Sequence, residues 1–332
     1  MNRKRDLSTG LLSTLGAAPT GERLERIRRS PHADGDRFRN LREVPTLLPG
    51  SLTRTVWQQV TGREERRPPG PLPVSVLGRH AFQTPPASGL RVTWLGHSTT
   101  LVEIDGFRVL TDPVWAERAS PSTLVGARRF HPPPLALDAL PPLDAVTISH
   151  DHYDHLDQAA IIALARTGVR FFVPLGVGAH LERWGVRPEA ITELDWWEDA
   201  ALTSRGGTLR LAAVPSQHYS GRGLRDGNRT LWASWVLTGP THRMYVGCDG
   251  GLTPTFAEVG RRYGPFDLAT LPIGQYGPTW PHIHLLPEEA VEAAGALQVG
   301  LVLPIHWGTF ALAFHDWREP AEQFVSRAEA SG

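Results

Sequence analysis

The sequence has little of several features, and each shortage excludes a class of protein. A single cysteine, Cys248, excludes an intramolecular disulfide and a cysteine-rich zinc site. The 34 basic and 34 acidic residues cancel, which argues against a dedicated nucleic-acid binder, because such domains are strongly basic. No apolar run approaches the roughly 18–20 residues of a membrane-spanning helix, so we expect no integral membrane protein. With 41% hydrophobic residues over 332 positions, a globular protein of one large or two modest domains remains.

The first 70 residues differ from the rest in charge. They hold 14 basic and 8 acidic residues and show no sustained hydrophobic period. We expect residues 1–35 to be a disordered basic arm, either a solvated tail or a segment attracted to anionic lipid headgroups. Residues 36–89 are expected to be an N-terminal extension that packs on the core. The leucines near position 12 imitate a weak export signal, but polar residues interrupt them, so we expect a cytoplasmic location, in part peripheral to the membrane.

From residue 90 onward, short β-branched runs alternate with turn residues. The dipeptide Asp105-Gly106 separates two of these runs and predicts a hairpin. Strands are expected at 90–95, 99–104, 107–110, 145–149, 170–173, 208–214, 230–237, 244–246, 268–271 and 301–305, and helices at 157–165, 255–263 and 287–297. Strands cluster first and then alternate with helices in both halves. This order predicts a layered α/β domain over residues 90–332 and not an all-β sandwich.

The strongest chemical signal is a run of histidines between a predicted strand and a predicted helix. Residues 149–157 read Ser-His-Asp-His-Tyr-Asp-His-Leu-Asp. His150 and His152 lie two apart on an extended turn and can converge on one point, whereas Asp154 and His155 can address a second point nearby. Imidazole and carboxylate groups are ligands of zinc and related divalent ions. The run therefore predicts a metal site.

Four ligands do not complete two metal sites, and the chain supplies three more polar residues just past hydrophobic strands. His218, Asp249 and His306 each follow one of the predicted strands. Any one of them taken alone fits an ordinary loop residue that has found a hydrogen-bond partner. Together with the histidine run, they predict the remaining ligands.

The order of these residues resembles a known family. His-x-His-x-Asp-His, followed by a distant His, Asp and His, is similar to the pattern of the metallo-β-lactamase fold hydrolases. Further motifs make the resemblance more specific: the chain is similar to the N-acyl-phosphatidylethanolamine-hydrolysing phospholipases D from about residue 35 to about residue 315. It is more distantly similar to the ascorbate-6-phosphate lactonases. These motifs are WLGHS at 94–98, LTDP at 110–113, RASP at 118–121, ELDWWE at 193–198, GPFDL at 264–268 and IHWGTFAL at 305–312.

The resemblance implies a four-layer αββα sandwich with an N-terminal extension and two zinc ions per chain. Histidine and carboxylate ligands also accept manganese or iron. A water or hydroxide that bridges the ions would attack phosphorus, with Asp154 and Asp249 among the catalytic residues. The implied ligands form two sets that share one bridging carboxylate: His150, His152 and His218; Asp154, His155 and His306; and Asp249 between them.

The resemblance also points to residues around the ligands. Asp112 matches an aspartate that orients a histidine ligand, although an aspartate before proline also forms turns. His97 would support the site from below or be a packed core histidine. His284 aligns with a histidine that contacts the phosphate or protonates the leaving group, for which an ordinary pKa of ~6.5 is suitable, and His282 is an equally placed rival. Three residues just before them would shape the substrate entrance or simply pack: Gln275, Tyr276 and Trp280.

One departure from the family lies at the bridging aspartate. The family usually has Gly-Asp-Thr-Gly there, whereas residues 248–251 read Cys-Asp-Gly-Gly. The aspartate that holds the metals is kept, but we expect the local hydrogen bonding to lose a hydroxyl.

The expected activity is that of a zinc-dependent phosphodiesterase of phospholipase D type, acting on N-acyl-phosphatidylethanolamine or a related glycerophospholipid. The alternative is a dinuclear metal hydrolase of a soluble lactone or phosphodiester. A nuclease is disfavoured because no basic module is present, and a non-catalytic scaffold because every expected ligand is present. We expect a phospholipid or small phosphodiester as substrate, no nucleic-acid partner and peripheral contact with a membrane, and a homodimer stays open.

Overall fold

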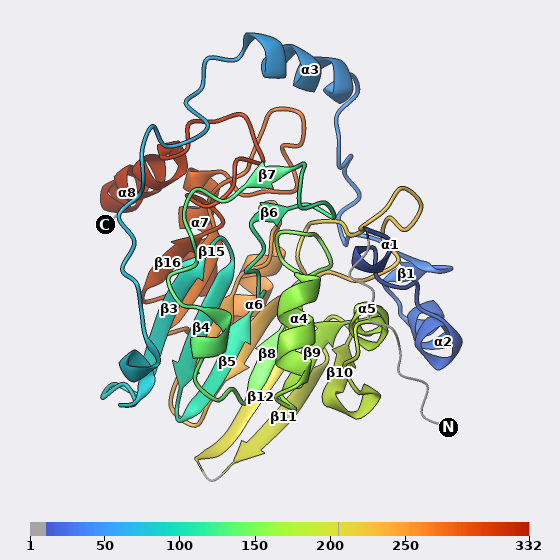
Figure 1. Ribbon diagram of the computed structural model, residues 1–332, viewed down its shortest axis with the longest axis vertical. Helices are drawn as coiled ribbons and strands as arrows, with labels where there is room; N and C mark the ends of the chain where they lie inside the picture. The colour runs from blue at the N-terminus through green and yellow to red at the C-terminus, as the bar shows by residue number, and fades with distance from the viewer. Residues whose placement is uncertain (1–10, 205, 332) are drawn as a thin grey trace.

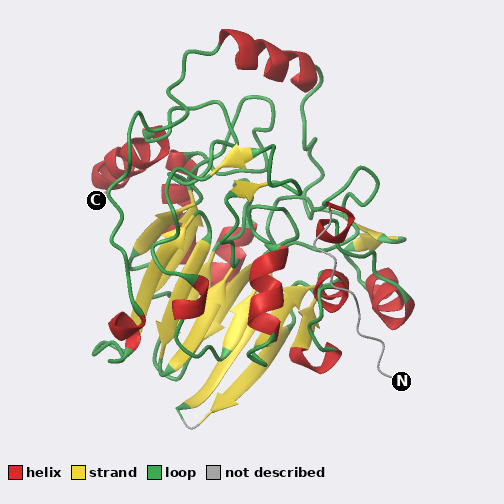
Figure 2. Ribbon diagram, viewed as in Figure 1, coloured by secondary structure: helices red, strands yellow, loops and turns green. Residues whose placement is uncertain are grey.

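The computed structural model describes residues 11–204 and 206–331. Two six-stranded sheets pack face to face, and helices cover the outer face of each (Figures 1 and 2). The four layers run helix, sheet, sheet, helix. The expected αββα sandwich is therefore confirmed.

The first sheet combines a meander with a parallel half. Its strands, in chain order, are β3 (Leu90–Gly96), β4 (Thr99–Ile104), β5 (Phe107–Thr111), β8 (Ala145–Thr147), β9 (Arg170–Pro174) and β10 (Ile191–Leu194). In space the order is β10-β9-β8-β5-β4-β3, with β3, β4 and β5 antiparallel and the others parallel. Asp105 and Gly106 have φ of 49° and 87°, the left-handed backbone that a two-residue type I′ hairpin turn requires. The predicted hairpin is confirmed.

The second sheet has the order of its strands in the sequence. These are β11 (Asp199–Ser204), β12 (Gly207–Val214), β13 (Ser234–Thr238), β14 (Arg243–Val246), β15 (Leu268–Pro272) and β16 (Val302–Ile305). The strand expected from residue 230 begins only at Ser234. Before it, the N–H groups of Leu231 and Ala233 donate to the carbonyls of Leu175 and Ser149, and not to a neighbouring strand. This segment therefore connects the second sheet to the loops that follow strands β8 and β9 of the first sheet through backbone hydrogen bonds.

Alternation along the strands builds three apolar layers. In β4, Val102 and Ile104 face the second sheet, whereas Leu101 faces the helices outside. In β12, Leu211 faces the first sheet and Ala212 faces outward. The outer helices are α4 (Gln158–Ala165) and α5 (Gly178–Arg183) on the first sheet, and α6 (Thr255–Tyr263) and α7 (Pro287–Leu297), with α8 (Glu319–Ser331) beside α7, on the second.

The N-terminal part differs from the expected disordered arm over residues 11–35. It contains α1 (Leu11–Thr14), α2 (Gly21–Arg29) and a small hairpin of β1 (Ala33–Asp34) and β2 (Arg37–Phe38). Ile27 of α2 is fully buried in the main core, and Arg23 forms ion pairs with Glu193 and Glu182 at N–O distances of 2.5 and 3.1 Å. Arginines that suggested a solvated tail are thus paired with distant glutamates. Residues 1–10 of the expected arm lie outside the described residues.

A third N-terminal helix, α3 (Ser51–Thr61), stands apart from the layers (Figure 1). The chain then returns to the body, where Glu65 accepts a backbone hydrogen bond from Trp317 and Arg66 donates to the carbonyl of Ala313. It continues through a short 3₁₀ turn (Arg79–Phe82) into β3, and a small hairpin of β6 (Arg118–Ala119) and β7 (Ala127–Arg128) lies below α3. Among the helices described, none is both long enough and apolar enough to cross a membrane.

Candidate metal centre

The loops after β8, β12, β14 and β16 meet at one edge of the sandwich, and each brings predicted ligands. His150 to His155 follow β8, His218 follows β12, Asp249 follows β14 and His306 follows β16. The structure brings all seven predicted ligands together in overlapping groups of histidine and carboxylate atoms. Most are fully buried, because hydrophobic strands end directly beneath them.

In the first group, three imidazole nitrogens converge. Nε2 of His150 lies 2.9 Å from Nδ1 of His152, and that nitrogen lies 3.3 Å from Nε2 of His218. Two unprotonated ring nitrogens that face each other at this distance repel one another through their lone pairs. A proton or a cation between them removes the repulsion, and three histidine nitrogens are a common zinc ligand set.

In the second group, two carboxylates and two imidazoles surround one point. Oδ2 of Asp249 lies 3.1 Å from Nε2 of His155 and 3.0 Å from Nε2 of His306. Oδ2 of Asp154 lies 3.4 Å from the same two nitrogens. Asp249 is also 3.9 Å from Nε2 of His218, so that its carboxylate stands between the two groups.

The charges and unpaired atoms of this cluster fit bound cations. Oδ1 of Asp249 is buried and has no hydrogen-bond partner among the described residues. The surrounding histidines hold the pKa of Asp154 and of Asp249 well below the usual range despite burial. Burial alone would lower the pKa of His306, but Asp249 and Asp154 raise it to about 9. The cluster thus holds positive charge tightly, and a divalent cation can replace the bound protons.

Asp112 and Ser149 fix the orientation of the ligands from behind. Asp112 accepts hydrogen bonds from Nδ1 of His155 (2.8 Å) and from both the backbone N–H and the hydroxyl of Ser149 (2.6 Å each). The Ser149 hydroxyl also lies 2.9 Å from Nδ1 of His150. Asp112 therefore occupies the orienting position that the resemblance implied, and Ser149 is an additional positioning residue.

Two more positioning residues have weak or no signals in the sequence. Asp151, between two ligands, accepts hydrogen bonds from the backbone of Gly221 and the hydroxyl of Thr230. Asn40 donates to the carbonyl of His218 and accepts from its N–H, at 2.8 and 3.1 Å. The position of Asp151 inside the histidine run could have revealed it, whereas Asn40 lies 178 residues from its partner.

Several site residues have a left-handed backbone. His97, Asp112 and His306 have φ of 52°, 39° and 65°, which is uncommon outside glycine and costs on the order of 1 kcal/mol each. Hydrogen bonds hold these turns, since the N–H of His306 donates to the carbonyl of His97, and the N–H of His97 to the Thr309 hydroxyl. The ring of His97 contacts Asp154 through Nε2 at 2.8 Å, so it supports that carboxylate from below.

His284 lines the same cavity as the ligands, whereas His282 is not among the residues that line it. Nδ1 of His284 is 4.0 Å from Oδ2 of Asp249 and is buried without a hydrogen-bond partner among the described residues. Burial lowers the pKa of His284 to about 4; the negative charge of Asp249 opposes this effect only in part, and His306 adds a smaller lowering. The ordinary pKa expected for this histidine is therefore wrong: its ring is neutral at pH 7.

The two glycines after Asp249, of which Gly250 replaces the threonine of the family, lie where a side chain would collide with a neighbouring loop. A Cβ on Gly250 would lie 2.2 Å from the hydroxyl of Ser216, which donates to the backbone carbonyl of Asp249 at 2.6 Å. A Cβ on Gly251 would lie 2.2 Å from the carbonyl of His282. A hydroxyl is thus present after all, supplied by Ser216, and the missing side chains let the loop with His284 approach the ligands.

Five of the seven ligands form the floor of a cavity of about 430 Å³: His152, Asp154, His218, Asp249 and His306. Its rim is largely apolar and aromatic, with Leu47, Tyr219, Trp280 and Leu312 around the mouth. Two of the three expected entrance residues, Gln275 and Trp280, line it. Tyr276 points elsewhere: its hydroxyl donates to Glu319 of α8 at 2.7 Å, and its ring stacks on a neighbouring histidine.

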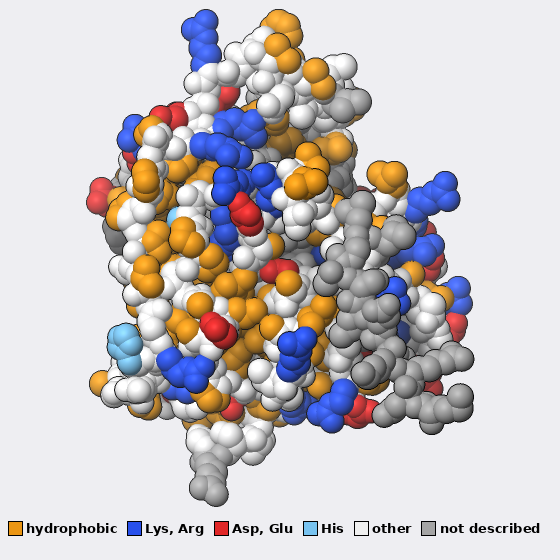
Figure 3. Space-filling view, viewed as in Figure 1, with side chains coloured by type: hydrophobic (Ala, Val, Ile, Leu, Met, Phe, Trp, Pro, Cys, Tyr) orange, Lys and Arg blue, Asp and Glu red, His pale blue; other side chains and the backbone are white. Residues whose placement is uncertain are grey.

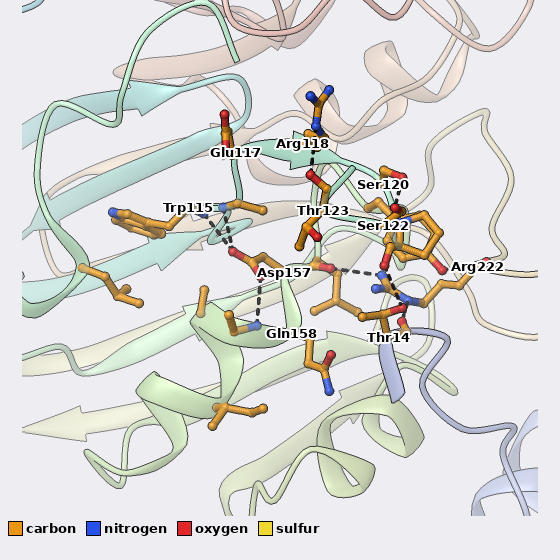
Figure 4. Close-up of a pocket in the computed structure, with 18 residues that line it drawn as sticks. Thr14, Trp115, Glu117, Arg118, Ser120, Ser122, Thr123, Asp157, Gln158 and Arg222 are labelled. Atoms are coloured by element: carbon orange, nitrogen blue, oxygen red, sulfur yellow. Dashed lines mark hydrogen bonds between the residues drawn. The ribbon is translucent and has the colours of Figure 1, made fainter. Parts of the chain in front are cut away.

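A second cavity, of about 380 Å³, lies behind the histidine run (Figure 4). Asp157 accepts hydrogen bonds there from the backbone of Trp115 and Ala116 and caps α4. Arg222 is buried, donates to the carbonyls of Asp151 and Leu156 and covers the ring of Tyr153 at 4.0 Å. These contacts fix the back of the ligand run without touching the metal-facing atoms.

Comparison with known proteins identifies the family. The sequence profile of the beta-lactamase superfamily domain matches residues 107–307, a range that includes all seven candidate ligands. The chain belongs to the metallo-β-lactamase superfamily of hydrolases. An uncharacterized protein from Mycobacterium tuberculosis is 50% identical to this hydrolase over 86% of this chain and 75% of the relative.

Another relative supports the narrower resemblance. N-acyl-phosphatidylethanolamine-hydrolyzing phospholipase D 1 from Caenorhabditis elegans is 39% identical over 78% of this chain and 75% of its own length. Among solved structures, Igni18, a metallo hydrolase from the archaeon Ignicoccus hospitalis, aligns with a TM-score of 0.56 and 24% identity over 73% of this chain and 91% of that one. That structural likeness shows the shared fold.

Proposed function

We propose that this hydrolase is a dinuclear metal phosphodiesterase of phospholipase D type, acting on N-acyl-phosphatidylethanolamine or a related glycerophospholipid. One observation carries the proposal: two ligand groups that share Asp249 form the floor of a cavity whose rim is apolar and aromatic. A phosphodiester can reach the floor while its lipid part stays against the rim. The name of the Caenorhabditis elegans relative supports this substrate class.

Different residues of the cavity would bind the metal ions and the phosphate group. Zinc or related ions held by the two groups would supply Lewis-acid charge and activate water. His284, neutral at pH 7, can donate one N–H to a phosphoryl oxygen from the cavity wall. Partial burial, together with Asp154 and Asp249, raises the pKa of Tyr219 to about 12, so its phenol stays protonated and can donate a second hydrogen bond.

Parallel assays test the proposal. The metal-loaded protein is given N-acyl-phosphatidylethanolamine, a soluble bis-aryl phosphodiester and a lactone panel, with Asp249→Asn as the inactive control. We expect the lipid to give the highest kcat/KM, with phosphatidic acid and N-acylethanolamine as products. In ¹⁸O-labelled water, attack at phosphorus places the label in phosphatidic acid. Turnover of lactones alone would instead support the soluble-substrate alternative.

A further inference from the structure

Helix α3 has its polar side toward the protein and its apolar side toward solvent. At about 100° per residue, Val56, Trp57 and Val60 share one face, and they are 56%, 69% and 78% exposed. A helix that covers the core of its own domain has the opposite orientation. The face toward the body carries buried or half-buried polar residues: Ser51, Thr55 and Gln58.

The helix is attached at the mouth of the metal cavity. The N–H of Leu48 and the hydroxyl of Ser51 both donate to the carbonyl of Thr279, each at 3.0 Å. Thr279 directly precedes Trp280 on the cavity rim, and Leu47 lines the same cavity. Figure 1 shows α3 standing above the loops at this edge of the sandwich. Whatever covers α3 therefore lies next to the entrance.

The charges around α3 favour an anionic partner. The helix contains no acidic residue, and residues 42–67 around it hold five arginines against three glutamates, a net charge of +2. Arg54, Arg63 and Arg67 form no ion pair within the described ranges. Figure 3 shows hydrophobic side chains over α3 and a group of basic side chains below it on the same face. Two copies of the chain that met through α3 would bring these arginines together, and their repulsion opposes such a dimer.

We propose that α3 is a docking helix for the surface of an anionic phospholipid bilayer. Val56, Trp57 and Val60 enter the boundary between headgroups and acyl chains, where tryptophan is favoured, and the arginines contact lipid phosphates. This inference rests on the proposed function: docking through α3 places the mouth of the metal cavity at the membrane, where the proposed lipid substrate lies. N-acylation removes the amine charge of phosphatidylethanolamine, so the proposed substrate is itself an anionic lipid.

Vesicle flotation with the full chain tests the docking helix. The vesicles contain phosphatidylcholine alone or mixed with phosphatidylglycerol, and binding is read without any need for turnover. The test variant is Val56→Ser/Val60→Ser. The matched control, Val76→Ser/Leu301→Ser, removes two side chains that are 83% and 61% exposed, with Leu301 at the sheet end opposite the ligands. Melting temperatures confirm that both variants are folded.

We expect binding to mixed vesicles, a loss of about tenfold or more in the test variant, and no change in the control. Brominated lipids should quench tryptophan fluorescence in the wild type, and much less in Trp57→Phe. Equal binding by all proteins, or no binding by the wild type, overturns the proposal. So does a dimer in solution that the test variant dissociates, because α3 would then cover a second copy. If docking is observed but the lipid is not hydrolysed, the proposed function fails and the docking helix stands.

Discussion

The floor and the rim of the same cavity are built in different ways. On the floor, ligand rings have a second partner: Nδ1 of His155 contacts Asp112 at 2.8 Å, and Nδ1 of His218 contacts the carbonyl of Ile283 at 3.0 Å. On the rim, Leu47 is 58% exposed and Tyr219 36%, and α3 is held at its first turn. These hydrogen bonds fix the orientation of the ligand rings on the floor, whereas the rim exposes apolar side chains to solvent. The floor is built for metal binding and catalysis, and the rim for contact with the substrate.

The largest effect is expected from the residue that joins the two ligand groups. Asp249→Asn removes a negative charge that faces both groups, so both ions should bind more weakly and turnover should fall by about 10³-fold or more. Elemental analysis after dialysis measures the metal content. Asp199→Asn, at an exposed aspartate of β11, is the matched control. If one ion stays fully bound, Asp249 serves a single group and does not bridge.

His284→Ala should lower turnover by about 10²-fold and leave the metal content intact. The loss arises because a hydrogen-bond donor to the phosphate is missing from the cavity wall. His282→Ala is the control and should be much milder. Because the pKa of His284 is lowered to about 4, it is protonated only below that pH, and the rate should show no fall through pH 6.5 that depends on this residue. Such a fall, abolished in His284→Ala, would show that it acts as a charged acid.

Asp112→Asn should weaken metal binding by about 10–100-fold, because the carboxylate accepts three hydrogen bonds through two oxygens, whereas an amide has only one accepting oxygen and its NH2 group would face a donor of Ser149 or His155. Competition with a chelator measures the affinity. Asp144→Asn is the matched control, since Asp144 also accepts a backbone N–H, from Arg108, away from the ligands. Equal losses in both variants would mean that Asp112 acts through general stability.

The sequence predicts the floor better than the rim for a physical reason. Metal ligands belong to few residue types and sit directly after hydrophobic strands, so His150, Asp249 and His306 stand out by type and position. Period-two alternation likewise predicts the strands that carry them. The rim depends on which distant segments pack together. Nothing in the sequence shows that Tyr276 turns toward α8, or that α2 pairs its arginines with glutamates far along the chain. Burial, which lowers the pKa of His284, is also a property of the folded chain.

Asn40 links the N-terminal extension to the floor, and its replacement should have a smaller effect. Asn40→Ala removes both hydrogen bonds that hold the backbone of His218 and one from the indole of Trp232. We expect one ion to bind about tenfold more weakly, which is the lower end of the roughly 10–100-fold effect of residues that hydrogen-bond to a metal ligand. Arg39→Ala, at its exposed neighbour, is the control. Stepwise metal titration separates the two ions, and equal weakening of both would contradict this assignment.

Substitutions in α3 should have the smallest effect on stability and on turnover of a soluble substrate. This small effect would distinguish the rim from the floor. Val56→Ser/Val60→Ser removes apolar groups that already face solvent, so the free energy of unfolding should change by no more than about 0.5 kcal/mol. Urea unfolding measures it, and turnover of the soluble bis-aryl phosphodiester should be unchanged because the ligands are untouched. Val102→Ala, in the layer between the sheets, should instead cost about 2 kcal/mol or more. A comparable loss in the α3 variant would mean that the helix packs on the body, and its apolar face would then need no membrane.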